Sequence, residues 1–163
     1  MTTTAEIKRA LLELHDELER TVAGITPSEL HWKADDSTWS VAQILAHVAE
    51  FEQFFSQDVL RLRDNPGTSF GRTMEHADRV QAVQLTGSEA LEGLLQSIEH
   101  SRQVTIDMLD GLTDADLLVE GNHPKFGVRT IEWEIGHFLT EHLEKHIGQV
   151  NRTKLAYKQS VVH

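Results

Sequence analysis

Two of the ten histidines in this 163-residue sequence, His142 and His146, lie four residues apart. In a helix this spacing places two side chains one above the other, so both imidazoles can point toward one ion. Apolar residues recur around the pair at steps of three and four, which puts both histidines on the side of the helix that faces the core. These apolar residues are Ile131, Ile135, Phe138, Leu139, Leu143, Ile147 and Val150.

A third histidine, His47, follows Ile44 and precedes Phe51 in a helical row beside the apolar stripe of an earlier segment. Burying three imidazoles without partners costs roughly 1–3 kcal/mol each, whereas one divalent ion satisfies all three and adds folding free energy. A three-histidine set leaves a coordination position open to water or substrate, which is typical of catalytic sites. Imidazole nitrogen binds zinc, nickel, iron(II) and copper, so the residues alone leave the metal open.

Two polar residues lie one helical turn from these histidines. Glu50 follows His47 and is the candidate to orient that ligand or to act as a catalytic proton shuttle, because a metal-bound histidine usually donates its other N–H to a nearby acceptor. The alternative is a surface carboxylate with no role in the site. Gln149 follows His146 by three residues and is a second candidate for such a hydrogen bond, within the site or to a neighbouring helix.

Other histidines are expected outside the site. His137 shares a polar helix side with Glu134 and Lys145, so we expect it to be solvated. His76 and His123 fall in loops or near loop ends, where a flexible imidazole could close over a substrate, but solvated side chains are the expectation for both.

Four amphipathic segments must position these side chains. They span about 4–24, 40–64, 88–109 and 130–157, with Ser40 and Ser88 as helix-starting residues. The longest connection, with Gly, Pro and polar residues, joins the second segment to the third, and residues 117–130 allow only a brief extended excursion. We therefore predict a single all-α domain over residues 1–163, an antiparallel four-helix bundle with a longer crossover between helices 2 and 3.

Composition excludes several classes of function. The chain has 15 Lys and Arg against 26 Asp and Glu, for a formal net charge of -11, and this predicts no nucleic-acid partner. It has no Cys, which excludes disulfides and thiolate metal sites. No apolar run approaches the ~20 residues that span a bilayer, and the polar amphipathic N-terminus does not have the pattern of a secretory signal. We expect a cytoplasmic protein that binds no membrane.

Two stretches resemble the signatures of the DinB-like (DinB/YfiT) superfamily. Residues 39–47 match its W-S-x-x-x-x-L-x-H pattern, and residues 142–150 are similar to its C-terminal H-x-x-x-H-x-G-Q-hydrophobic helix. The resemblance implies a four-helix bundle and a divalent metal ion, often zinc or nickel, held by His47, His142 and His146. It also implies a homodimer.

The same resemblance implies a metal-dependent enzyme acting on a small molecule. Thiol S-transferases that use a low-molecular-weight thiol occur in the family, so we place thiol transfer ahead of hydrolysis by a metal-bound water. The alternative from another class is a non-catalytic, metal-stabilised dimeric bundle with a stress-related binding role. A purely structural bundle without an ion is the third possibility.

Overall fold

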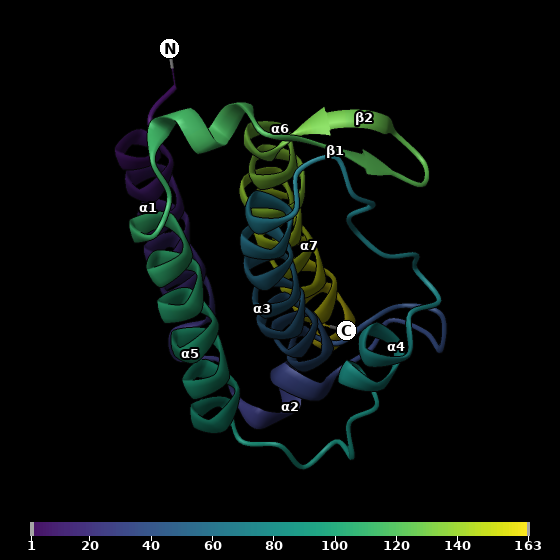
Figure 1. The fold of residues 1–163 in the computed structure, drawn as a ribbon. Helices are drawn as coiled ribbons and strands as arrows, with labels where there is room; N and C mark the ends of the chain where they lie inside the picture. The colour runs from purple at the N-terminus through teal and green to yellow at the C-terminus, as the bar shows by residue number, and fades with distance from the viewer. Residues whose placement is uncertain (1, 163) are drawn as a thin grey trace.

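The computed structural model describes residues 2–162, and within them four long helical segments form a bundle (Figure 1). The second and third of these segments run in the same direction, and the first and last run in the opposite direction. These segments are α1 (Thr4–Val22), α3 (Val41–Asp64), α5 (Leu91–Asp110) and a C-terminal helix. The C-terminal helix comprises α6 (Ile131–Ile135), the π-helical turn η2 (Gly136–Thr140) and α7 (Glu141–Val161). The all-α bundle predicted from the sequence is confirmed.

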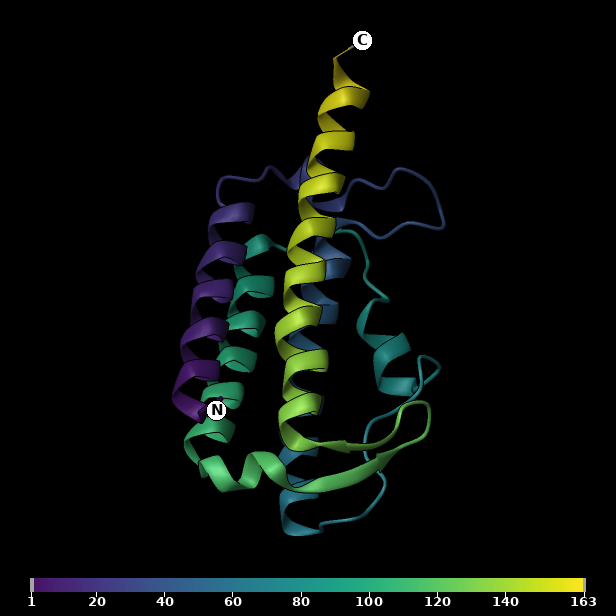
Figure 2. The same cartoon turned by 90° about the horizontal axis from the view of Figure 1, so that it is seen from above.

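The helices surround a continuous apolar core. Helix α3 packs most extensively against α5 and also against α7, while α1 contacts both α5 and α7; Figure 2 shows α1 and α5 side by side. Helix α3 is the most deeply buried, with Val41, Ile44, Leu45, Val48 and Val59 fully excluded from solvent. Within residues 2–162, none of the helices combines the length and hydropathy needed for a bilayer crossing.

The start of α3 is defined by the residues before it. The Ser40 hydroxyl accepts a hydrogen bond from the Gln43 backbone N–H at 3.1 Å, and the Gln43 side-chain oxygen accepts one from the Ser40 N–H at 3.0 Å. This reciprocal arrangement satisfies two N–H groups that have no partner within the helix. It sets the helical register that places His47 two turns further along, and it confirms Ser40 as the helix-starting residue.

The sequence predicted that this helix starts at Ser88, but helix α5 begins at Leu91. The reason is that the Glu89 carboxylate accepts hydrogen bonds from the backbone N–H groups of Thr86 and Gly87 and from the Thr86 hydroxyl. These bonds hold residues 86–89 in a turn and lower the pKa of Glu89 to about 2. The chain enters the helix only after that turn.

Short elements fill the connections. Helix α2 (Pro27–His31) follows α1, and α4 (Ala77–Ala82) lies in the long crossover between α3 and α5. After α5 come the 3-10 turn η1 (Asp114–Leu118) and an antiparallel hairpin of β1 (Glu120–His123) and β2 (Gly127–Thr130). The hairpin is the brief extended excursion expected between the last two helices. The Gln43 side-chain amide donates to the Val83 carbonyl at 3.0 Å and ties the crossover to α3.

The π-helical turn η2 explains why the predicted polar side of the last helix is wrong at Glu134. Apolar residues at 131, 135, 139, 143 and 147 are four apart, a step that drifts about 40° around an ideal α-helix of 3.6 residues per turn. A π-helical turn has an extra residue per turn and absorbs this drift. The residues before η2 therefore face a different direction from the one extrapolated from α7, and Glu134 is fully buried.

Candidate metal centre

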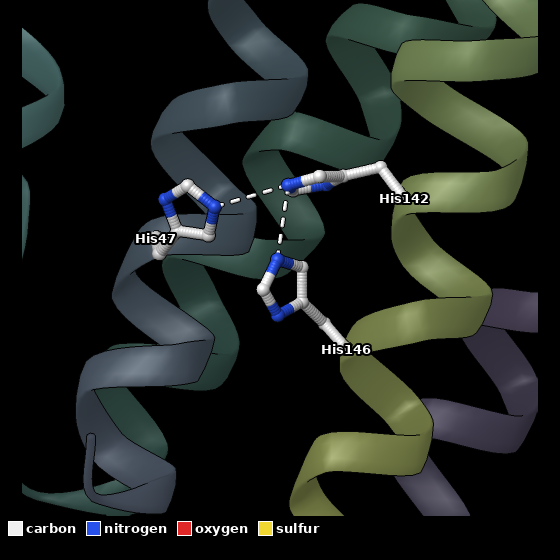
Figure 3. A group of neighbouring side chains, drawn as sticks. All are labelled: His47, His142 and His146. Carbon is white, nitrogen blue, oxygen red and sulfur yellow. Dashed lines mark hydrogen bonds between the residues drawn. The ribbon is translucent and has the colours of Figure 1, made fainter. Parts of the chain in front are cut away.

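Three histidine rings from two helices point toward one another (Figure 3). His47 comes from α3, and His142 and His146 come from α7. The Nε2 atom of His142 lies 3.0 Å from Nε2 of His47 and 3.0 Å from Nε2 of His146. We call these three residues the histidine cluster. The prediction that they converge is confirmed.

The cluster has the donor set and the spacing of a metal site. Its ligand atoms all lie within 4.8 Å of one another. Zn–N bonds of about 2.0–2.1 Å place neighbouring nitrogens of a tetrahedral ion about 3.3 Å apart, so the 3.0 Å separations need to change by only a few tenths of an ångström. With three ligands from the protein, the cluster leaves a coordination position for a small molecule.

Gln149 determines which imidazole nitrogen of His146 faces the cluster. Nδ1 of His146 donates to the Gln149 side-chain oxygen at 2.6 Å, which leaves the Nε2 lone pair of His146 directed at His142. Without a metal ion, a single proton on His142 Nε2 would have to form the hydrogen bonds to both His47 and His146. A cation between the rings instead accepts a lone pair from each imidazole. Of the two positions considered for the Gln149 hydrogen bond, within the site or to a neighbouring helix, the structure shows the first.

Aromatic rings enclose the cluster. The Trp39 ring centroid lies 4.9 Å from that of His47 and 6.4 Å from that of His146. The Phe51 ring stacks on His142 with centroids 3.6 Å apart and planes within 7°. These contacts restrict the orientation of all three imidazoles and reduce the access of water to them.

Burial keeps the histidine cluster neutral. Together with the charges of His146, Arg79, Arg72 and Lys145, it lowers the pKa of His47 from 6.5 to about 3. Burial also lowers the pKa values of His142 and His146, again with Lys145 and Arg79 as contributing charges. Neutral imidazole is the form that binds metal ions, so the cluster is ready to bind a metal at pH 7.

Glu50 lies one turn after His47, as expected, but its carboxylate is engaged elsewhere. It forms a two-pronged ion pair with Arg72, including a contact of 2.6 Å between Oε2 and Nη1. The guanidinium carbon of Arg72 lies 4.2 Å from the Phe54 ring centroid, and the arginine side chain is only 3% exposed. The catalytic role of Glu50 stays a prediction.

The remaining sequence candidates lie away from the cluster. His76 caps α4, where its Nδ1 accepts from the Asp78 N–H, and its side chain is 37% exposed. His137 is 38% exposed and lies 3.4 Å from the Glu141 carboxylate, which agrees with the solvated position expected for it. The solvated position expected for His123 is wrong, because the hairpin folds this imidazole against the Phe138 ring and buries it.

The sequence analysis missed two buried polar groupings. Glu134 is fully buried beside Asp58, where burial and charge repulsion from Asp58 raise its pKa to about 10. His15 donates through Nε2 to the Glu52 carboxylate at 2.7 Å, and Ser101 donates to the other oxygen of Glu52 at 2.7 Å. The periodicity of the first helix could have shown that His15 faces inward. Pairing across helices has no signal in a single sequence.

Solved structures of similar fold match almost the whole chain. YfiT from Bacillus subtilis, described as a probable metal-dependent hydrolase with an unusual four-helix bundle topology, has 18% sequence identity and a TM-score of 0.76. The match covers 95% of this chain and 87% of YfiT. An uncharacterised protein from Clostridium difficile 630 has 12% identity and a TM-score of 0.72, with 100% and 99% of the two chains covered. Among curated proteins, none matches this sequence.

A third similar structure corrects the prediction about partners. The colibactin self-resistance protein ClbS was crystallised in complex with double-stranded DNA. It has 14% identity to this chain and a TM-score of 0.64, with 93% of this chain and 95% of ClbS covered. The exclusion of nucleic acid is therefore wrong: net charge describes the whole surface, and it does not decide what a local surface of this fold can bind.

The sequence identity to these solved structures is too low to assign the chain to a family. A family model makes that assignment. The model of the DinB superfamily matches residues 10–150. This range contains the complete histidine cluster, Gln149 and both signature stretches recognised in the sequence. Because the match extends over most of the sequence, the chain belongs to the DinB superfamily.

Proposed function

We propose that this protein is a metal-dependent enzyme that hydrolyses a small molecule at the histidine cluster. One observation carries the proposal: three neutral imidazoles, those of His47 and His146 buried and that of His142 half-buried, converge on one point, and within residues 2–162 this group supplies three protein ligands. Closed structural sites have four ligands, whereas hydrolytic sites keep a position for water. A divalent ion, zinc or nickel, bound here would supply Lewis-acid activation of water or of another nucleophile.

The chain's own residues have distinct tasks in this proposal. His47, His142 and His146 bind the ion, and Gln149 holds the His146 ring in the orientation that directs Nε2 inward. Trp39 and the other enclosing aromatic rings exclude bulk water, which strengthens electrostatic interactions in the site. Glu50 is the nearest candidate proton carrier along α3, and it could act only by releasing one prong of its pair with Arg72.

The description of YfiT as a probable metal-dependent hydrolase supports hydrolysis over thiol transfer. Both reactions begin with a nucleophile bound at the same open position, so they differ in the co-substrate consumed. Thiol transfer stays the second candidate on the ground of the family resemblance. A panel of chromogenic esters, amides and phosphoesters, assayed with and without a low-molecular-weight thiol, separates the two reactions.

Metal content is the first test. We expect protein purified without a histidine tag to contain about one divalent ion per chain by elemental analysis. His142→Ala removes a central ligand and should abolish metal binding and activity, whereas the control His137→Ala, on the same helical segment but outside the cluster, should change neither. Equal metal content in both variants, or spectroscopic evidence of a fourth protein ligand, contradicts the proposal.

A further inference from the structure

A cavity lies between α1 and α5, on helices that carry none of the histidine cluster. Its volume is about 570 Å³, within the range of roughly 300–1,000 Å³ that is usual for small-molecule sites. All of its lining residues fall within 15–102, and the three cluster histidines, which lie between α3 and α7, are not among them. A ligand in this cavity would therefore be separate from the metal centre.

The floor of the cavity is apolar. Leu91 and Leu95 lie one helical turn apart on α5 and Ile98 follows one turn later, so the three side chains share a helical face. Leu18 completes the floor from α1. Leu18 and Ile98 are buried, but Leu91 and Leu95 are only half-buried. An apolar group that covers these two leucines removes their surface from water, which favours binding.

The rim of the cavity is acidic. Four exposed carboxylates line it, Asp16 and Glu19 from α1 and Glu92 and Glu99 from α5. The one lysine or arginine in the lining is Arg102, which pairs with Glu99 at 3.2 Å. Among the described residues, the other three carboxylates form no ion pair. The rim thus has an excess of negative charge that attracts cations.

His15 adds a buried acceptor to this lining. Its side chain is 4% exposed, and its Nε2 donates to the Glu52 carboxylate at 2.7 Å. The Ser101 hydroxyl donates to the other oxygen of Glu52, which holds that carboxylate in place. In a neutral imidazole the remaining nitrogen, Nδ1, then carries a lone pair, and Nδ1 has no hydrogen-bond partner in the part of the chain that the structure describes. An N–H donor on a ligand matches this lone pair.

We propose that the cavity between α1 and α5 binds a small organic cation, an ammonium group joined to an apolar body. The ammonium group lies among the carboxylates of the rim, and the apolar body covers Leu91 and Leu95. Charge complementarity supports this class of ligand, because the free groups of the lining are carboxylates and an imidazole lone pair, which all accept hydrogen bonds. The proposal goes beyond the proposed function and does not depend on it.

The test is titration calorimetry with three probes of one shape, at physiological salt. Tryptamine is the cation, tryptophol its neutral analogue and indole-3-propionate the anion. Tryptamine should bind about tenfold more tightly than tryptophol, and indole-3-propionate should not bind. Glu19→Gln and Glu92→Gln should each weaken tryptamine binding about two- to fivefold and leave tryptophol binding unchanged.

Two more variants complete the set. His15→Gln keeps an N–H donor for Glu52 but removes the Nδ1 acceptor, and it should also weaken tryptamine binding. If His15→Gln does not fold, the two exposed glutamate variants still test the proposal. Glu13→Gln is the matched control, because Glu13 is exposed on α1 but does not line the cavity, and its affinity for tryptamine should equal that of the wild type.

Backbone amide NMR shifts locate the bound tryptamine, and we expect the largest shifts at residues 15–19 and 91–102. Shifts centred on residues 47 and 142–146 place the amine at the metal centre and overturn the proposal. Absence of tryptamine binding at millimolar concentration overturns it too, as does tryptophol affinity equal to that of tryptamine, or an affinity that neither glutamate variant changes. A dimer that dissociates in Glu19→Gln or Glu92→Gln, without tryptamine binding, identifies the cavity as a protein interface instead.

Discussion

Glu134 provides the sharpest quantitative test of the structure, because its carboxyl group is fully buried near the start of the C-terminal helix. Burial, together with the nearby Asp58 carboxylate, raises its pKa from 4.5 to about 10. Glu134 is therefore protonated in the folded protein at neutral pH, whereas the same side chain is ionised in the unfolded chain. We predict that Glu134→Gln, which keeps the shape and is neutral at every pH, stabilises the protein increasingly as pH rises.

The magnitude follows from proton linkage. Between pH 4.5 and 10 the folded state holds one more proton at Glu134 than the unfolded state does. The free energy of unfolding therefore falls by about 1.4 kcal/mol for each pH unit from this group. Over the interval from pH 6 to pH 8, the advantage of Glu134→Gln over the wild type should grow by about 2.7 kcal/mol.

Urea denaturation at pH 6 and pH 8, with equal metal loading, measures this change as a shift in midpoint at constant slope. The wild type and the variant share all their other titratable groups, so the contributions of those groups cancel in the difference between their free energies of unfolding. Glu132→Gln is the control, because Glu132 lies two residues away on α6 but is partly exposed, and its difference from the wild type should not change with pH. If the gain in the free energy of unfolding from Glu134→Gln is the same at pH 6 and pH 8, Glu134 is not a buried, protonated carboxyl group in the folded protein.

Other predictions address the site and its supporting elements. Gln149→Leu should lower metal affinity 10- to 100-fold in a competition assay with a chelator, and a change below twofold contradicts its orienting role. Ser40→Ala should lower the free energy of unfolding by about 1 kcal/mol, as measured by urea denaturation; no loss contradicts the cap. Gly71→Ala should cost more than about 1 kcal/mol in the same assay, because φ is +84° and a Cβ would lie 2.6 Å from the His123 ring. Gly93→Ala, in an open helical position, should instead stabilise by about 0.5–1 kcal/mol.

The histidine cluster shows how far local spacing can predict a site. The interval between His142 and His146 places both on one helical face, and the apolar row around His47 places it at an inward position. These are properties of single helices, so periodicity is sufficient to predict them. That the three rings meet at 3.0 Å depends on how α3 packs against α7, and the family signatures, rather than periodicity, link the two helices.

The charged side chains around the site could be located only from the tertiary structure. Glu50 has the spacing of a partner for His47, yet Arg72, 22 residues away, pairs with it because the crossover returns along α3. The same crossover brings Arg79 to Trp39. Side chains that pair across a long loop depend on the path of that loop, and the Gly- and Pro-containing stretch that forms it has no periodic pattern from which its path follows.

Sequence alone determined the helical segments, the apolar faces and the identity of the three histidines, because each depends on interactions within a few residues along the chain. The tertiary structure decided the burial of Glu134 and His123 and the positive surroundings of the histidine cluster. The physical reason is that burial and electrostatics depend on which distant segments pack together. At η2, that packing favours a π-helical turn and changes the face that the preceding residues present to the core.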